Sequence, residues 1–169
     1  METIASLLDL SIQGENCSRM FYEGLADRFI HEKNISDFWR NMAEDEADHI
    51  KMLDNLRKSL SNDQLNAGID KDIFQAALEN SKVNINDVLD MVKNLNDAYI
   101  LATLWENSEI YRVFEYLVTN CIPLMRNGAD GRFARLHMST HRKKLEAFAC
   151  AFGDASLRKG INISQPGNN

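Results

Sequence analysis

Acidic residues and histidines recur along the sequence at spacings that suit metal binding. Glu46 and His49 form a Glu-x-x-His pair, and Glu106 and Glu109 repeat its three-residue spacing. Side chains three positions apart share one face of a helix, so both members of a pair can reach a common point. Oxygen-rich sites with one or two imidazoles suit Fe(II) and Mn(II), and to a lesser degree Zn(II). For Glu109 an alternative stays open, because this residue can pair with Arg112 instead.

Two further segments add candidate ligands. Glu15 stands alone near the start of the chain, whereas His137 and His141 lie four residues apart and also share a helical face. A purely structural interpretation competes with two of these assignments. Glu15 can be a buried glutamate bonded to Ser11 or Ser18, and His137 can be a histidine of the core or of its rim. The residue types alone leave these alternatives open.

Helical periodicity explains how these residues could meet. Four stretches place apolar side chains at intervals of three and four residues, and almost none of the chain alternates as a strand does. We predict long helices over residues 4–29, 34–60, 92–120 and 130–153. Asn34 and Asp130 are suited to be N-caps of the second and the fourth. Candidate ligands interrupt every inward stripe, although charged side chains are rarely buried without partners. We therefore expect the ligands to meet inside a bundle.

The connections between these helices predict the topology. Residues 31–34 and 121–129 are short links, so the helices that they join should be antiparallel neighbours. Residues 61–93 are long enough to cross the length of a bundle, and Asp70 and Asn84 are suited to cap two short helices there. We predict an all-α fold, an up-down four-helix bundle with a long helical crossover between its second and third helices.

Length and composition fit one domain and exclude some partners. The chain has 169 residues, of which 44% are hydrophobic, and its formal net charge is −6. We assign residues 1–153 to the bundle and residues 154–169 to a flexible C-terminal tail. Nucleic acid is excluded as a partner, because phosphate binding needs clustered Lys and Arg. The sequence has no apolar run of about 20 residues for a membrane span and no signal-peptide pattern at its start, which favours the cytoplasm.

At the candidate ligands the chain resembles the rubrerythrin-like branch of the ferritin-like superfamily. The segments that resemble the first half of that family's site are Gly14-Glu15 through Tyr22, and Glu46-Ala47-Asp48-His49 followed by Leu53. The pair Glu106-x-x-Glu109 resembles the glutamate pair of its third helix. The resemblance covers about residues 3–152 and implies the layout of carboxylate di-iron bundles, in which glutamates and Glu-x-x-His pairs project inward from four helices.

The last helix departs from the family pattern. Met138-x-x-His141 followed by Leu145 resembles the family's final Glu-x-x-His motif, with Met138 in place of the glutamate. The metal ligands that the resemblance implies are Glu15, Glu46, His49, Glu106, Glu109 and His141. It also implies that the Tyr22 hydroxyl lies beside a glutamate. His137 is a candidate replacement for the missing ligand. We expect iron, either two ions or one firmly and one weakly bound, with manganese and zinc as alternatives.

Two functions from different classes follow from this pattern. The first is a di-iron oxidoreductase of the peroxidase or ferroxidase type, which handles oxidants or iron by reducing dioxygen or peroxide. Because the sequence has no Cys-x-x-Cys for a rubredoxin-like iron, such a protein would need an external electron donor. The second is a degenerate single-metal or metal-free bundle that acts as a sensor or binding module, which the presence of Met138 favours. We expect a homodimer in either case.

Overall fold

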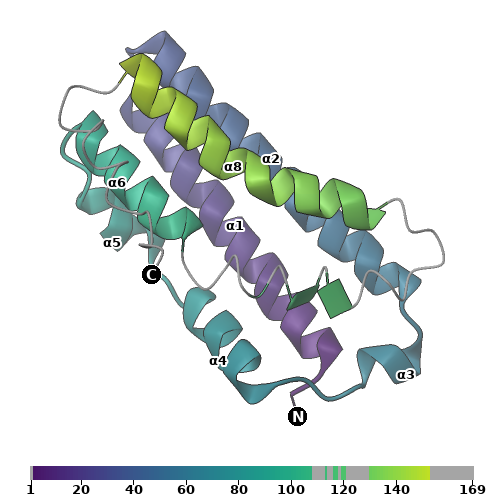
Figure 1. The fold of residues 1–169 in the computed structure, drawn as a ribbon. Helices are drawn as coiled ribbons and strands as arrows, with labels where there is room; N and C mark the ends of the chain where they lie inside the picture. The colour runs from purple at the N-terminus through teal and green to yellow at the C-terminus, as the bar shows by residue number, and fades with distance from the viewer. Residues whose placement is uncertain (1, 108–112, 114–115, 118, 121–129, 153–169) are drawn as a thin grey trace, which may run out of the picture.

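The structure is a computed structural model that describes residues 2–107, 113, 116–117, 119–120 and 130–152, with the backbone alone described over 130–139. Its described part is helical and contains no β-strand, which confirms the all-α prediction. The helices are α1 (Ile4–Arg28), α2 (Lys33–Ser59), α3 (Asn62–Leu65), α4 (Lys71–Asn80), α5 (Ile85–Asp90), α6 (Leu95–Glu106) and α8 (Asp130–Phe152). The long helices α1, α2 and α8 lie along one another, with α6 beside them (Figure 1).

The first two helices form a tight antiparallel hairpin. Ser36 on α2 donates a hydrogen bond of 2.8 Å to the carbonyl oxygen of Ala26 on α1, which ties the helices together beside their connection. The prediction that Asn34 caps α2 is wrong. The carbonyl oxygen of Glu32 accepts from the backbone N–H groups of Ile35 and Ser36, so the helix already begins at Lys33. The short turn leaves this carbonyl free for the first helical bonds, and Asn34 therefore lies inside α2.

The crossover after α2 contains the short helices α3, α4 and α5. The Asp70 carboxylate accepts from the backbone N–H groups of Asp72 and Ile73, and Asn84 accepts from that of Asn86, which confirms both predicted caps. Helices α4 and α5 pack against α1. The crossover therefore covers one side of the hairpin, as Figure 1 shows.

The third long helix differs from the prediction at both ends. It begins at Leu95, because Asn94 caps it by accepting from the backbone N–H of Asp97 at 3.0 Å. An unbroken helix through residue 120 is also wrong, since α6 ends at Glu106 with Asn107 as its C-cap. Arg142 on α8 donates to the side-chain oxygen of Asn107 at 3.1 Å, and α6 packs against α8. The break places Glu106 in the last turn of α6, next to α8.

Two apolar clusters lie along the bundle with a polar layer between them. One cluster includes the buried rings of Phe21, Tyr22 and Trp39, and the other includes Leu7 and Leu53. In sequence, α1 and α2 pass from one cluster to the other through buried polar residues. The apolar residues on both sides fix the level of that polar layer. In the described part of the chain, no helix combines the length and apolar character that crossing a membrane requires.

Candidate metal centre

The polar layer holds four buried ionisable residues from three helices. Glu15 comes from α1, Glu46 and His49 from α2, and His141 from α8. Glu15 is 4% exposed, Glu46 is 3% exposed and His141 is 2% exposed. The three-residue step from Glu46 to His49 puts both side chains on the face of α2 that also carries buried apolar residues.

His49 joins the carboxylates of α1 and α2. Its Nδ1 lies 2.9 Å from Oε2 of Glu46 and 3.2 Å from Oε2 of Glu15. One imidazole nitrogen thus faces two carboxylates from different helices. The same three side chains can bind a metal ion between them once Nδ1 of His49 loses its proton, because a metal ligand must offer its lone pair.

His141 completes the layer from the other side. Its Nδ1 lies 3.2 Å from Oε1 of Glu106 and 3.5 Å from Oε1 of Glu46. The hydroxyl of Tyr22 donates to the same Oε1 of Glu106 at 2.5 Å. The rings of His49 and His141 are 5.0 Å apart between centroids. Glu46 therefore lies between the two histidines, with one carboxylate oxygen toward each.

Three of these residues meet a geometric requirement for binding one ion. Glu46, His49 and His141 are all buried, and each offers a ligand atom within 4.8 Å of those of the other two. The donor set combines carboxylate oxygen with imidazole nitrogen, which fits iron, manganese or zinc. The residues present therefore fit a bound metal, and Glu15 and Glu106 lie within hydrogen-bond range of the two histidines.

Asp45 contributes to the centre although the sequence pattern did not indicate it. Its Oδ2 lies 3.1 Å from Nε2 of His141, and it also pairs with Lys144 on α8. A carboxylate against the outer nitrogen of a histidine orients the ring and keeps the inner nitrogen toward the metal. Asp45 lies next to Glu46 but off the apolar stripe of α2, so periodicity alone gave no reason to select it. Its contacts with His141 and Lys144 join distant parts of the chain, so no spacing within α2 indicates them.

The comparisons with known proteins identify the family. The family model for rubrerythrin matches residues 6–123, well over half of the chain. This chain belongs to the rubrerythrin family. Searches of the curated proteins and of the solved structures each found no match. The helical bundle is accordingly of the ferritin-like type. The matched region contains Glu15, Glu46, His49 and Glu106 but ends before α8, so only the geometry of the bundle places His141 beside them.

Electrostatics in this rubrerythrin centre link the carboxylates to the histidines. Burial acts to lower the pKa of His141, but its contacts with Asp45 and Glu106 outweigh burial and raise the pKa to about 10. Likewise, burial opposes the charge on His49, yet its hydrogen bonds with Glu15 and Glu46 hold its pKa well above the usual value. In the absence of metal, these contacts favour the protonated form of both imidazoles, which offsets the charge of the buried carboxylates.

The pKa values of the two buried carboxylates, Glu46 and Glu15, shift in opposite directions. Burial and the neighbouring Glu15 raise the pKa of Glu46 to about 8. Burial also acts to raise the pKa of Glu15, but the hydrogen bond and the charge of His49 reverse this and lower it. The charge of Glu15 therefore favours the protonated form of Glu46. Burial, together with the charge of Glu106, raises the pKa of Tyr22 well above its ordinary value, so Tyr22 remains a hydrogen-bond donor.

Three residues selected from the sequence cannot be placed in this centre. Glu109 lies outside the described residues. His137 and Met138 lie on the described backbone of α8, but their side chains are outside the description. The structure thus brings together Glu15, Glu46, His49, Glu106 and His141, places the Tyr22 hydroxyl on Glu106, and leaves the remaining three as predictions.

Replacing Asp45 tests whether it orients His141. We expect Asp45→Asn to weaken binding of Zn(II) by about 10-fold to 100-fold, the usual effect of losing a carboxylate behind a metal-bound histidine. Isothermal titration calorimetry with the purified variants measures this change. Asp48→Asn is the matched control, because Asp48 is exposed on the same helix and pairs only with Lys51 among the described residues. Equal affinities for the two variants would contradict the role of Asp45.

Proposed function

We propose that this rubrerythrin-family protein binds iron in its buried carboxylate–histidine layer and reduces peroxide or dioxygen with electrons from an external donor. The observation that supports this most is the meeting of Glu46, His49 and His141 at one point of the core. Burying that many ionisable groups costs stability unless they pair or bind a metal. A bundle that needed only stability would have apolar side chains at this level.

The candidate ligands are distributed unequally between two pairs of helices, α1 with α2 and α6 with α8. Glu15, Glu46 and His49 come from the α1–α2 hairpin, which is joined by a short turn and by the Ser36 hydrogen bond. Glu106 and His141 come from α6 and α8, where the sequence carries Met138 in place of the expected glutamate. We propose that the hairpin side holds one metal firmly and that the α6–α8 side holds a second one weakly, because a thioether is a poor ligand for a hard metal.

The surrounding residues have definable roles in such a reaction. Iron would supply the redox change, and the reduction of one peroxide to two waters consumes two electrons and two protons. The Tyr22 hydroxyl holds Oε1 of Glu106 at 2.5 Å and fixes that carboxylate beside His141. Buried aromatic and aliphatic side chains above and below the layer exclude bulk water. The electrons must come from a separate donor, because this chain has no Cys-x-x-Cys motif for a rubredoxin-like iron.

Oxidation of the ferrous protein tests the redox proposal. We expect anaerobic Fe(II)-loaded protein to be oxidised by one addition of hydrogen peroxide within seconds, followed by near-ultraviolet absorbance of ferric iron. Glu46→Gln removes the carboxylate that lies between the two histidines, so this variant should bind less iron and be oxidised at least about 10-fold more slowly. Glu44→Gln, exposed on the same helix, is the control and should behave as the unmodified protein. Equal rates in the two variants, or ferrous protein that peroxide leaves unoxidised, would contradict the proposal.

Met138 favours a second candidate, a single-metal or metal-free bundle that acts as a sensor or binding module. The substitution Met138→Glu separates the two proposals. If a latent second pocket exists beside His141, the new carboxylate should raise the iron content from about one toward two per chain. Iron analysis and the melting temperature of the variant measure the outcome.

The alternative gives the opposite pattern in the same variant. If no second pocket exists, the new glutamate is a buried acid without a partner, which costs several kcal/mol. The variant would then melt earlier and bind no additional iron. That result would end the proposal of a two-metal centre and leave only the proposed hairpin site of Glu15, Glu46 and His49.

A further inference from the structure

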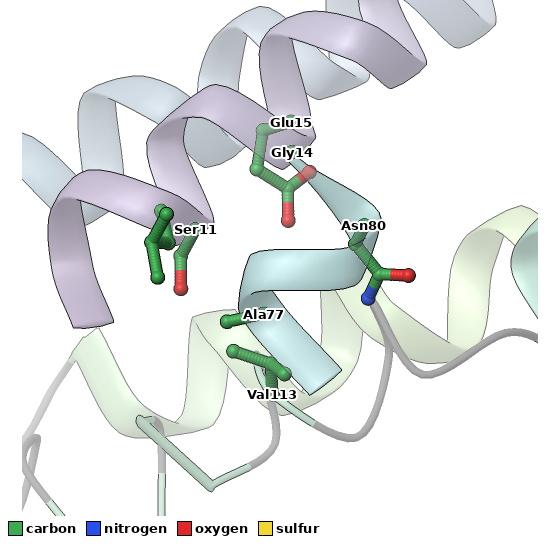
Figure 2. A pocket seen from close by; sticks show the side chains of 7 residues that line it. Ser11, Gly14, Glu15, Ala77, Asn80 and Val113 are labelled. Carbon is green, nitrogen blue, oxygen red and sulfur yellow. The ribbon is translucent and has the colours of Figure 1, made fainter. Parts of the chain in front are cut away.

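A small cavity lies beside Glu15, between α1 and the crossover helix α4. Its lining is Leu10, Ser11, Gly14, Glu15, Ala77, Asn80 and Val113. In Figure 2 the Glu15 carboxylate points from α1 toward the space next to α4, and Asn80 lies across that space at the end of α4. The space open to the centre of a water molecule is about 10 Å³, which is the volume needed for one water.

Asn80 brings an unsatisfied donor to this cavity. Its Nδ2 is buried, and among the described residues no acceptor lies within hydrogen-bond range. A buried N–H group without a partner is rare in native proteins, and an ordered water is a common partner for such a group. The end of α4 is fixed next to α1, because Gln13 donates to the carbonyl oxygen of Ser81 at 3.1 Å. Asn80 is thus held beside the cavity by the residue that follows it.

The other polar groups of the lining are acceptors. The carboxylate of Glu15 accepts hydrogen bonds, and the hydroxyl hydrogen of Ser11 is already donated to the carbonyl oxygen of Leu7 at 2.8 Å. The Ser11 oxygen can therefore only accept from a molecule in the cavity. One donor and two acceptors are within the capacity of a single water, which can accept two hydrogen bonds and donate two. The donor nitrogen of Asn80 disfavours a cation in the same place.

We propose that the cavity is a binding site for one ordered water that accepts from Asn80 and donates to Glu15 and Ser11. Through this water the crossover helix reaches a carboxylate that lies 3.2 Å from Nδ1 of His49. Asn80 is then a positioning residue, because it fixes the Glu15 carboxylate without touching the metal. Gly14 lines the same cavity, and the space beside it is open, since a Cβ at this position would meet no heavy atom within 4 Å.

The positioning role rests on the proposed metal function, whereas the water site does not. A high-resolution crystal structure of the whole protein tests the site directly. We expect an ordered oxygen within about 3.2 Å of both Asn80 Nδ2 and a Glu15 carboxylate oxygen. An empty cavity, or an Asn80 amide turned toward another acceptor, would overturn the proposal.

Two variants test the positioning role, with Zn(II) affinity measured by calorimetry. Asn80→Leu removes the donor, and Gly14→Ala adds a methyl group to the cavity lining, where it meets no heavy atom within 4 Å. We expect both variants to lose the ordered oxygen and to bind Zn(II) about 10-fold more weakly, as expected when support of a ligand is lost. Asn86→Leu, at an exposed position of α5, is the control and should retain both. Circular dichroism establishes that each variant is folded.

The outcomes separate the water site from the metal function. If the water is present but both variants bind Zn(II) as tightly as the unmodified protein, the positioning role is wrong. If the unmodified protein binds no Zn(II), the proposed metal function fails, and the crystal structure still decides whether the water is bound.

Discussion

A carboxylate placed between two apolar layers is stable only when a cation, a donor or a metal meets it, because the low dielectric around it penalises an isolated charge. Glu15 and Glu46 are in this position, and His49 and His141 are the groups that meet them. The rest of the structure is arranged around that requirement. Helices α1, α2 and α8 have to deliver their polar side chains at one level, and the apolar clusters on either side fix the level.

The same requirement explains the residues that surround the cluster. The Tyr22 hydroxyl donates a hydrogen bond to Glu106, and Oδ2 of Asp45 lies 3.1 Å from the outer nitrogen of His141. Asp45 in turn pairs with Lys144, so charge alternates outward from the core to the surface. These contacts connect the buried cluster to side chains that are partly exposed. A metal that replaced the protons on Nδ1 of His49 and His141 would leave these outer contacts in place. It would change only the contacts of the two Nδ1 atoms with the buried glutamates.

Much of this arrangement could be predicted from the sequence, because local periodicity determines it. The stripes of α1 and α2 show which residues face inward, and Glu46 and His49 fall on the stripe between Met42 and Leu53. The end of α6 at Glu106 could not be predicted, since the periodic pattern continues past the capping residue Asn107. Asp45 was missed because its partner His141 is almost 100 positions away, and spacing within one helix carries no information on such a contact. The position of Asn80 beside Glu15 depends on how the crossover packs, which is also a long-range property.

The central claim is that the buried cluster is a metal site and not only a set of paired charges. Anomalous diffraction at the iron edge, from crystals grown anaerobically with Fe(II), tests it most directly. The account predicts an anomalous peak in the core about 2.0–2.2 Å from an oxygen of Glu46 and from Nδ1 of His49, of His141 or of both, distances typical of such ligands. A core without a peak, with iron bound only at surface carboxylates or nowhere, would contradict it.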